Sequence, residues 1–290
     1  MTTLAKTVTY VVLLLWSFVC VFPMYWLVLA SFKAPNDQFD GPTYAPFIDF
    51  EPTLEAWNFI LADAHENLLW PFYNSLVISL AATVIAVLLA GFVVYGVTRF
   101  PVRDGKSSIA GDHLLFWMMA TRILPPFVLA LPLYFMAQKT GTLDTVFPLI
   151  FAYAAVNLPV AIWLLRPVLG GRASEMEESA LLEGASHLRV FFEFVVPVSA
   201  TGFAAVSFIV FILCWNEYLF AAFLTTSNAM TLSPWAIGQL SMKEAQVGGE
   251  AEEWAHLSAA TVFMMLPVLA FAVSIQRFLS RLLIWSGSGN

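Results

Sequence analysis

Long apolar runs alternate with short polar connections along the chain. Six runs are each long enough to cross the hydrocarbon core of a bilayer as a helix, which takes about 20 mostly apolar residues. They cover residues 8–31, 72–98, 113–136, 143–168, 198–224 and 256–283. The pattern predicts an all-α, polytopic membrane protein with six transmembrane helices that form one transmembrane domain over residues 1–290. The first run is too long for the apolar part of a cleaved signal peptide.

Composition supports the membrane class independently of the pattern. The 290 residues are 60% hydrophobic and 11% charged, whereas soluble domains average about 25% charged residues. Cys20 and Cys214 both lie in apolar runs and are expected to pack as small hydrophobes. The four histidines are scattered without the spacing of metal ligands. We therefore expect no disulfide framework, no metal site and no nucleic-acid partner.

Basic residues set the expected orientation, because Lys and Arg are enriched in cytoplasmic connections. With the N-terminus inside, nine of them fall on the cytoplasmic side: Lys6, Arg99, Arg103, Lys106, Arg166, Arg172, Arg189, Arg277 and Arg281. Three fall outside: Lys33, Lys139 and Lys243. We predict that both termini are cytoplasmic and that residues 169–197 form a cytoplasmic loop. The connections 32–69 and 225–255 are then external.

The segment GKSS at 105–108 resembles the end of a phosphate-binding P-loop. That motif requires a glycine five positions before Gly105, where Phe100 stands, and a preceding β-strand, where a membrane helix is predicted. We expect a polar cytoplasmic turn. Any ATP would then be bound by a partner.

The cytoplasmic stretch 174–197 carries an amphipathic pattern. Ser174 and Glu177 fit a capping box. Four apolar residues then recur at helical spacing, at Leu181, Ala185, Leu188 and Phe192. Gly184 interrupts this pattern, which predicts a joint between two short helices or a close approach by another backbone. Two interpretations remain open for the stretch: docking to another protein, or a helix lying on the lipid surface.

The spacing in this stretch resembles the EAA motif of ABC importer permeases, E-A-A-x₃-G-x₉-I-x-L-P. Glu178-Ser179-Ala180 is followed after three residues by Gly184, and after nine more by Phe194-Val195-Val196-Pro197. Ser179, Phe194 and Val196 depart from the motif by similar residues. Further segments are similar to the carbohydrate-uptake branch of these permeases, which includes the second membrane subunit of the maltose importer. They are SFKAP, NSLVIS, LPPFVLALPLYF, LPVAIWLLRPVL and CWNEYLFA.

The resemblance implies a subunit of an ATP-driven sugar or polyol importer that is not itself an enzyme. Its implied partners are a second homologous permease, two ATPase subunits that bind ATP and Mg²⁺, and an extracytoplasmic substrate-binding protein. It implies a bacterial or archaeal cytoplasmic membrane, and no cofactor bound by this chain. The residues expected to couple the chain to the ATPase are Glu178, Ser179, Ala180, Glu183, Gly184, Ala185 and Pro197.

Polar residues within the predicted spans are candidates for the substrate pathway. Arg122 falls near the middle of the third span, where a charged side chain is expected to face protein or water. Trp215, Asn216, Glu217 and Tyr218 follow one another in the fifth span. Asn157, Tyr134 and Tyr153 are weaker candidates. For each, structural packing is the alternative, and WNEY is expected equally to contact the second permease. The resemblance implies that the loop 225–255 faces the binding protein.

Two other transporter assignments stand as alternatives. A permease of the same class with a glycerol derivative as substrate fits the same residues. A secondary transporter would show inverted repeats and ion-coupling carboxylates at the bilayer midplane. Glu217 is the one such carboxylate, and no repeat is evident.

Overall fold

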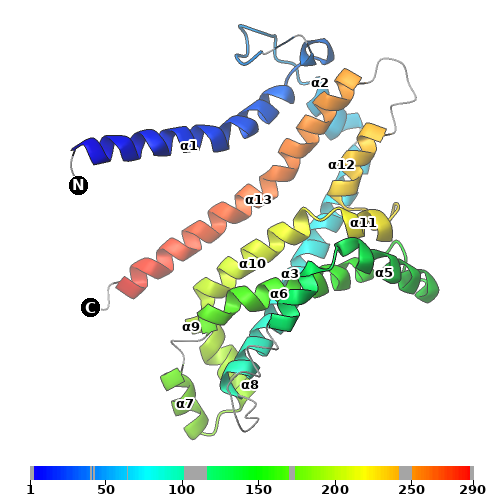
Figure 1. Cartoon of the computed structure of the whole chain (residues 1–290). Helices are drawn as coiled ribbons and strands as arrows, with labels where there is room; N and C mark the ends of the chain where they lie inside the picture. The colour runs from blue at the N-terminus through cyan, green and yellow to red at the C-terminus, as the bar shows by residue number, and fades with distance from the viewer. Residues whose placement is uncertain are drawn as a thin grey trace. The chain divides into compact units, whose positions relative to one another are not determined.

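The computed structural model describes residues 3–39, 41, 43–63, 65–100, 116–169, 174–241 and 250–287 (Figure 1). Regular structure in these ranges is helical, apart from a bridge between Pro46 and Phe50. The GKSS segment and the central part of the 225–255 loop lie outside the described residues. The expectation of an all-α membrane protein is confirmed.

Four of the six apolar runs form single long helices. These are α1 (Thr3–Ala30), α3 (His65–Arg99), α6 (Val146–Leu169) and α13 (Glu250–Gly287). Each contains a segment long and apolar enough to span a membrane. Apolar residues persist for well over 20 positions in each run, so the helix satisfies its own backbone polar groups inside lipid.

The third run is not one continuous helix in its described part. A helical turn at residues 116–120 leads into a 3-10 turn, Thr121–Ile123, and α5 (Pro126–Thr140) begins after a break. Leu124 and Pro125 have extended backbone, with ψ of 127° and 132°. Each of these residues precedes a proline, and a following proline disfavours the α conformation. The tandem prolines therefore break the helix inside the predicted third span.

The fifth run is also divided. It forms α10 (Ala200–Trp215) and α11 (Leu219–Leu224), separated by residues 216–218. The helical stretch before it, His187–Val198, meets α10 at an angle of 83°. The described residues thus contain four single-helix spans, or five if this bent pair counts as one.

The remaining elements are short. They are the 3-10 turn Pro35–Gln38, α2 (Glu55–Asn58), the π-helical turn Phe59–Asp63, α7 (Ser174–Leu182), α8 (His187–Val190), the π-helical turn Phe191–Val195, α9 (Val196–Val198) and α12 (Leu232–Ser241). The chain divides into two compact units. Unit 1 comprises Met1–Trp70 and Pro234–Pro267, and unit 2 comprises Pro71–Ser233 and Val268–Asn290.

Unit 1 contains a buried cation just after α1. Lys33 is 1% exposed, and its Nζ lies 4.5 Å from the ring centroid of Trp26 and 5.3 Å from that of Phe50. Burial lowers the pKa of Lys33, while the nearby Asp37 and Asp49 act to raise it. The aromatic faces replace part of the hydration that the ammonium group loses.

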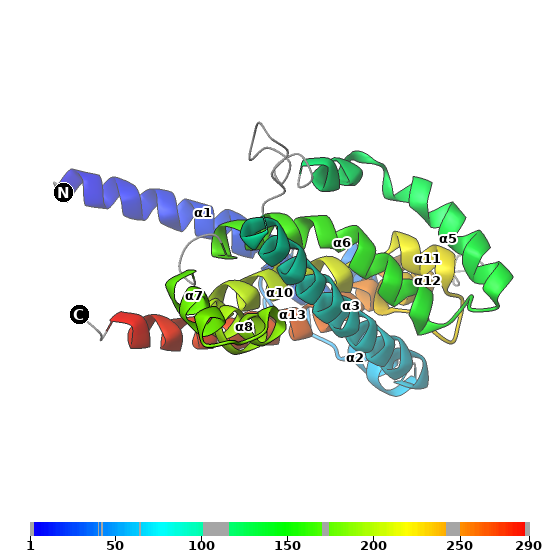
Figure 2. The ribbon, with the colours of Figure 1, turned by 90° about the horizontal axis from the view of Figure 1, so that it is seen from below.

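Unit 2 holds a core formed by α3, α6 and α10 (Figures 1 and 2). Buried residues recur every fourth position on α3, at Ile78, Ala82, Ala86, Ala90 and Val94. Three of the five are alanines, and small residues allow membrane helices to approach closely. The unit therefore provides a tightly packed frame for the polar residues described below.

Candidate functional site

The loop between α6 and α10 contains a helix–turn–helix whose turn is made by Gly184. The N–H of Ala185 donates to the Ala180 carbonyl, and the N–H of Gly184 donates to the Leu181 carbonyl, both at 3.0 Å. This pair of bonds is a Schellman motif, which requires a left-handed residue just after the helix. Gly184 has φ of +88°, a conformation open to glycine at little cost. The predicted joint between two short helices is confirmed.

The second helix of the motif begins immediately after this turn. Ser186 is the N-cap of α8, where its Oγ accepts a hydrogen bond from the backbone N–H of Arg189 at 3.3 Å. Such a cap satisfies one of the free N–H groups at a helix start. Two local signals, Gly184 and Ser186, thus set the geometry of the turn.

A groove of about 150 Å³ lies beside the turn. It is lined by Ala180, Glu183, Gly184, Ala185, Arg189, Glu193 and Phe194. Four of the predicted coupling residues therefore share one surface feature. Glu178 and Ser179 are exposed on α7, outside the groove, and Pro197 is exposed on α9. Two charged side chains of the groove, Arg189 and Glu193, form an ion pair at 2.8 Å.

The apolar pattern predicted for this loop is only partly correct. Leu188 and Phe192 are 64% and 50% exposed, whereas Val190, Phe191 and Val195 are buried. The left-handed turn at Gly184 resets the helical phase, so the residues after it face differently from those of an uninterrupted helix. The exposed apolar side chains then join the outward-facing surface of the loop.

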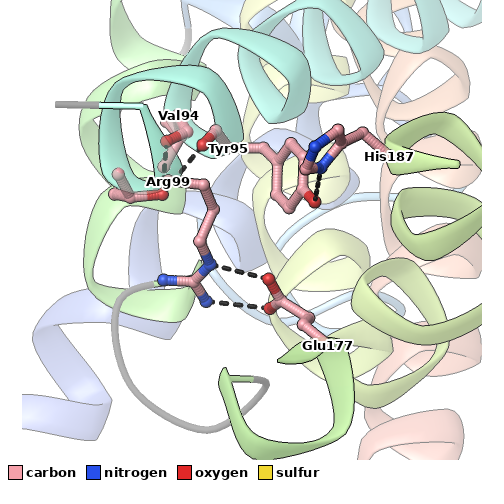
Figure 3. Close-up of polar contacts among 6 residues, drawn as sticks. Val94, Tyr95, Arg99, Glu177 and His187 are labelled. Atoms are coloured by element: carbon pink, nitrogen blue, oxygen red, sulfur yellow. Dashed lines mark hydrogen bonds and ion pairs between the residues drawn. The ribbon is translucent and has the colours of Figure 1, made fainter. Parts of the chain in front are cut away.

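An ion pair that sequence reasoning missed attaches this loop to α3 (Figure 3). Nε of Arg99 donates to one oxygen of Glu177 at 2.6 Å, and a terminal guanidinium nitrogen donates to the other at 2.8 Å. Glu177 is 2% exposed. Because Arg99 donates to both of its carboxylate oxygens, the Glu177 side chain is held against α3. Glu177 lies three residues before the buried Ala180, so both are on the same face of α7. This spacing was the signal in the sequence that Glu177 faces the rest of the chain.

Two further contacts lie next to the ion pair on the same helix. The Tyr95 hydroxyl lies 3.4 Å from Nδ1 of His187 (Figure 3). The Phe92 ring stacks on that of Phe191, with centroids 4.5 Å apart. Phe92, Tyr95 and Arg99 follow at intervals of three and four residues, so one face of α3 binds α7, α8 and the turn after α8.

A second site gathers four of the predicted pathway residues, Tyr153 among them, into one pocket of about 160 Å³ in unit 2. Arg122, Asn157 and Glu217 line it, with Tyr153 and the apolar residues Pro126, Val156, Leu213, Leu219 and Phe220. These residues come from the third, fourth and fifth apolar runs. The broken third and fifth runs supply Arg122 and Glu217, because each break exposes side chains that a straight helix would direct elsewhere.

Hydrogen bonds hold most of the polar groups of this pocket. The two carboxylate oxygens of Glu217 accept from the N–H groups of Phe220 and Ala221, at 2.9 and 3.2 Å, and so cap α11. Asn157 donates to the Tyr153 carbonyl at 2.9 Å. No salt bridge joins Arg122 to Glu217, although the structure describes both. Arg122 is an exposed residue, and its guanidinium group is a source of hydrogen-bond donors for the pocket that it lines.

The other predicted pathway residues lie outside the pocket. Trp215 is buried, and its ring contacts Phe211 and Phe72 with centroids 5.6 and 6.0 Å apart. Asn216 is exposed and donates to the Ile212 carbonyl of its own helix. Tyr218 is exposed, and so it is available to other molecules. The four residues of WNEY therefore have different roles. Trp215 packs in the core, Glu217 caps α11, and Asn216 and Tyr218 lie on the surface.

Asp144, between α5 and α6, holds the start of the loop that follows α11. Its carboxylate accepts hydrogen bonds from the backbone N–H groups of Thr226, Ser227, Asn228 and Ala229, at 2.9–3.3 Å. Burial acts to raise the pKa of this carboxyl, but the four N–H donors outweigh it and lower the pKa well below its usual range. Asp144 itself has φ of +59°. Sequence reasoning placed this residue at the start of the fourth apolar run and gave it no role.

Comparison with known proteins places this geometry in context. Residues 105–285 match the family model for the binding-protein-dependent transport system inner membrane component. The probable ABC transporter permease protein y4oR of Sinorhizobium fredii is 32% identical over 91% of this chain and 88% of its own. The diacetylchitobiose uptake system permease protein NgcG of Streptomyces coelicolor is 29% identical over 93% and 84%.

The fold also matches a solved structure. A chain of a bacterial ABC transporter involved in the import of the acidic polysaccharide alginate superposes with a TM-score of 0.72. The match covers 95% of this chain and 96% of that one, at 17% identity. The two chains therefore share an overall fold despite little shared sequence.

Proposed function

The chain belongs to the family of binding-protein-dependent transport system inner membrane components, and we propose that it is a permease subunit of an ATP-driven importer for a sugar or polyol. Membership in this family makes it a transporter subunit and removes the secondary transporter from consideration. A second homologous permease would complete the translocation pathway. Two ATPase subunits would bind ATP and Mg²⁺, and an extracytoplasmic binding protein would deliver the substrate.

In this proposal the chain crosses a bacterial or archaeal cytoplasmic membrane six times. The third and fifth crossings, over residues 113–136 and 198–224, would be made by the broken helices. Both termini would be cytoplasmic, in keeping with the nine basic residues on that side. The helix–turn–helix around Gly184 would then face the cytoplasm, and residues 225–255 would face the binding protein.

The observation that carries the proposal is the exposed turn at Gly184. It lies in a sequence with EAA spacing, on a helix that is fixed to the rest of the chain through Glu177. The helix–turn–helix presents small residues and charged residues around its groove, next to the exposed Leu182 and Leu188. This surface suits insertion of the helix–turn–helix into a cleft of another protein. We propose that the ATPase binds here, and that closure of two ATPases around ATP moves both permeases from an inward-open to an outward-open state.

A carbohydrate substrate is supported by two comparisons. The name of NgcG gives diacetylchitobiose as its substrate, and the structural neighbour is involved in alginate import. The pocket around Arg122 and Glu217 adds hydrogen-bonding groups suited to hydroxyls.

Co-purification tests this function directly. The tagged chain, extracted from its native host in mild detergent, is expected to bring with it an ATPase and a second permease. Its deletion is expected to abolish uptake of at least one sugar or polyol. Isolation of the chain as a stable species without an ATPase, together with unchanged uptake across a carbohydrate panel, would contradict the proposal.

The pocket gives a second prediction. Arg122→Gln is expected to lower the maximal rate of sugar uptake by about 10-fold or more, because a hydrogen bond to a charged group contributes about 1.5–3 kcal/mol. The substrate concentration at half-maximal uptake is expected to stay the same, since the binding protein sets it. Uptake of radiolabelled substrate into cells measures both values.

Two variants control for other causes. Arg122→Lys keeps the charge and is expected to lose less activity than Arg122→Gln. Lys139→Gln removes an exposed cation from α5 outside the pocket, and we expect no effect. Equal rates for Arg122→Gln and the unaltered chain would show that the pocket is not on the substrate pathway.

A further inference from the structure

The helix α3 contacts both loops through which this chain would meet its partners. Its last turns bind the helix–turn–helix through the Arg99–Glu177 ion pair, with donor–acceptor distances of 2.6 and 2.8 Å (Figure 3). Glu177 lies on α7 directly before Glu178, the first residue of the EAA-like motif. A displacement of α7 therefore acts on α3 as well as on α6 and α8, its neighbours in sequence.

The geometry of this inner contact opposes sliding. A guanidinium group that donates two hydrogen bonds to one carboxylate fixes both distance and orientation. Aromatic contacts support the pair one and two turns earlier, where Tyr95 and Phe92 lie against Phe191, with centroids 5.6 and 4.5 Å apart. A β-carbon on Gly91 would lie 3.0 Å from the Phe191 ring. This part of α3 is thus fitted closely to the loop.

The other end of α3 binds the start of the 225–255 loop. Nδ2 of Asn74 donates to the carbonyls of Asn228 and Met230, at 2.9 and 3.1 Å. Oγ of Ser75 accepts from the N–H of Leu232 at 2.8 Å. Asn74 and Ser75 are each 2% exposed. Asp144 holds the same loop from a second side, so its position follows that of α3.

Between these two contacts α3 is an uninterrupted helix. Ser75 and Arg99 are separated by roughly 36 Å at 1.5 Å per residue, which exceeds the hydrocarbon thickness of about 30 Å. The prolines that break the third run have no counterpart in this interval. An unbroken, packed helix transmits displacement along its axis, whereas a broken one absorbs it at the break.

We propose that α3 is the element that couples the ATPase-facing loop to the receptor-facing loop, with Arg99–Glu177 as its inner attachment and Asn74 as its outer one. This inference rests on the proposed function, because it takes the two loops to be the contact sites for ATPase and binding protein. Arg99, Glu177 and Asn74 are positioning residues. They touch no substrate, but they transmit the effect of the external binding protein to the cytoplasmic ATPase.

The test uses the complete importer reconstituted in lipid vesicles, with purified binding protein and its sugar. The measured quantity is the ratio of ATP hydrolysis with loaded binding protein to hydrolysis without it. Glu177→Gln and Asn74→Ala are each expected to lower this ratio by about 5-fold or more, the lower end of usual allosteric coupling. Basal hydrolysis and co-purification of the ATPase are expected to persist, which a merely unfolded chain would not allow.

Two combinations make the test specific. The exchange Arg99→Glu with Glu177→Arg restores an ion pair with reversed polarity and is expected to recover much of the ratio that Arg99→Glu alone loses. Glu177→Gln combined with Asn74→Ala is expected to do no more harm than either change alone, because one broken attachment already disconnects the helix. If the two sites acted independently, the double variant would lower the stimulation ratio by the product of the two single effects. Thr98→Val serves as control, since among the described residues the Thr98 hydroxyl donates only to the Val94 and Tyr95 carbonyls of α3 itself.

The outcomes separate this inference from the proposed function. If the unaltered complex contains no ATPase or shows no stimulation by a loaded binding protein, the proposed function fails. If the unaltered complex is stimulated and the Glu177→Gln and Asn74→Ala complexes are stimulated equally, only the role of α3 is refuted. Multiplied losses in the double variant would also refute it.

Discussion

Replacing Gly184 with valine is expected to abolish substrate uptake while the chain still inserts into the membrane. Gly184 has φ of +88° at the end of α7, and a left-handed conformation costs an L-residue roughly 1–2 kcal/mol, most for a β-branched one. The turn can relieve this strain only by changing the angle between α7 and α8. No other atom of the described chain lies within 4 Å of the position of an added β-carbon, so the open space is available to the ATPase.

The prediction is checked by uptake of labelled sugar, together with the amount of the chain in membranes and the ATPase that co-purifies with it. Gly184→Asn is expected to retain more uptake than Gly184→Val, because asparagine tolerates the left-handed region. Gly96→Ala is the matched control, since an added β-carbon at this α3 glycine also meets no atom within 4 Å. Full uptake by the Gly184→Val chain would remove the turn from the coupling mechanism.

Long helices were the most predictable part of this fold, for a local reason. In α1, α3, α6 and α13 the apolar pattern continues over more residues than a bilayer requires, and no tandem proline interrupts it. Hydropathy is summed over neighbouring residues, so it detects such segments without knowledge of the rest of the chain. The break before α5 depends instead on two particular residues, Pro125 and Pro126, which a sum over about 20 positions cannot register.

The candidate sites divide in the same way. The turn at Gly184 was predictable, because a glycine within an amphipathic pattern signals a local change of backbone. The Arg99–Glu177 ion pair was not, since the partners are 78 positions apart in sequence and each had a sufficient local explanation. Arg99 suited a cytoplasmic anchor and Glu177 a helix cap. Only the packing of α7 against α3 brings them together.

Asp144 shows how a short connection can contain more structure than its composition suggests. Its carboxylate holds backbone N–H groups that lie more than 80 positions further along the chain. A single acidic residue before a helix gives no sign of such a distant partner. Its lowered pKa keeps it ionised to more acidic pH than an ordinary aspartate, which maintains the charge that these N–H groups bind.

A close contact between two helices of unit 2 leads to the second large effect. Gly202 on α10 faces Val168 on α6, and a β-carbon added to Gly202 would lie 2.2 Å from one methyl group of Val168 and 2.8 Å from the other. Valine cannot easily turn these methyl groups away, because a β-branched side chain in a helix has one strongly preferred rotamer. Gly202→Val is therefore expected to separate α6 from α10 and to destabilise the chain by about 3 kcal/mol or more.

Exchanging the two residues tests whether volume at this contact is the cause. Gly202→Val is expected to lower both the yield of monodisperse protein in detergent and its thermal unfolding temperature. Addition of Val168→Gly restores the summed side-chain volume, and we expect it to recover most of the loss, apart from about 1 kcal/mol for a second helical glycine. Val168→Gly alone is expected to be milder than Gly202→Val, because it leaves space where the other change forces a clash. If the exchange fails to recover stability while Gly202→Ala is harmless, then α6 and α10 do not meet as closely as these distances require.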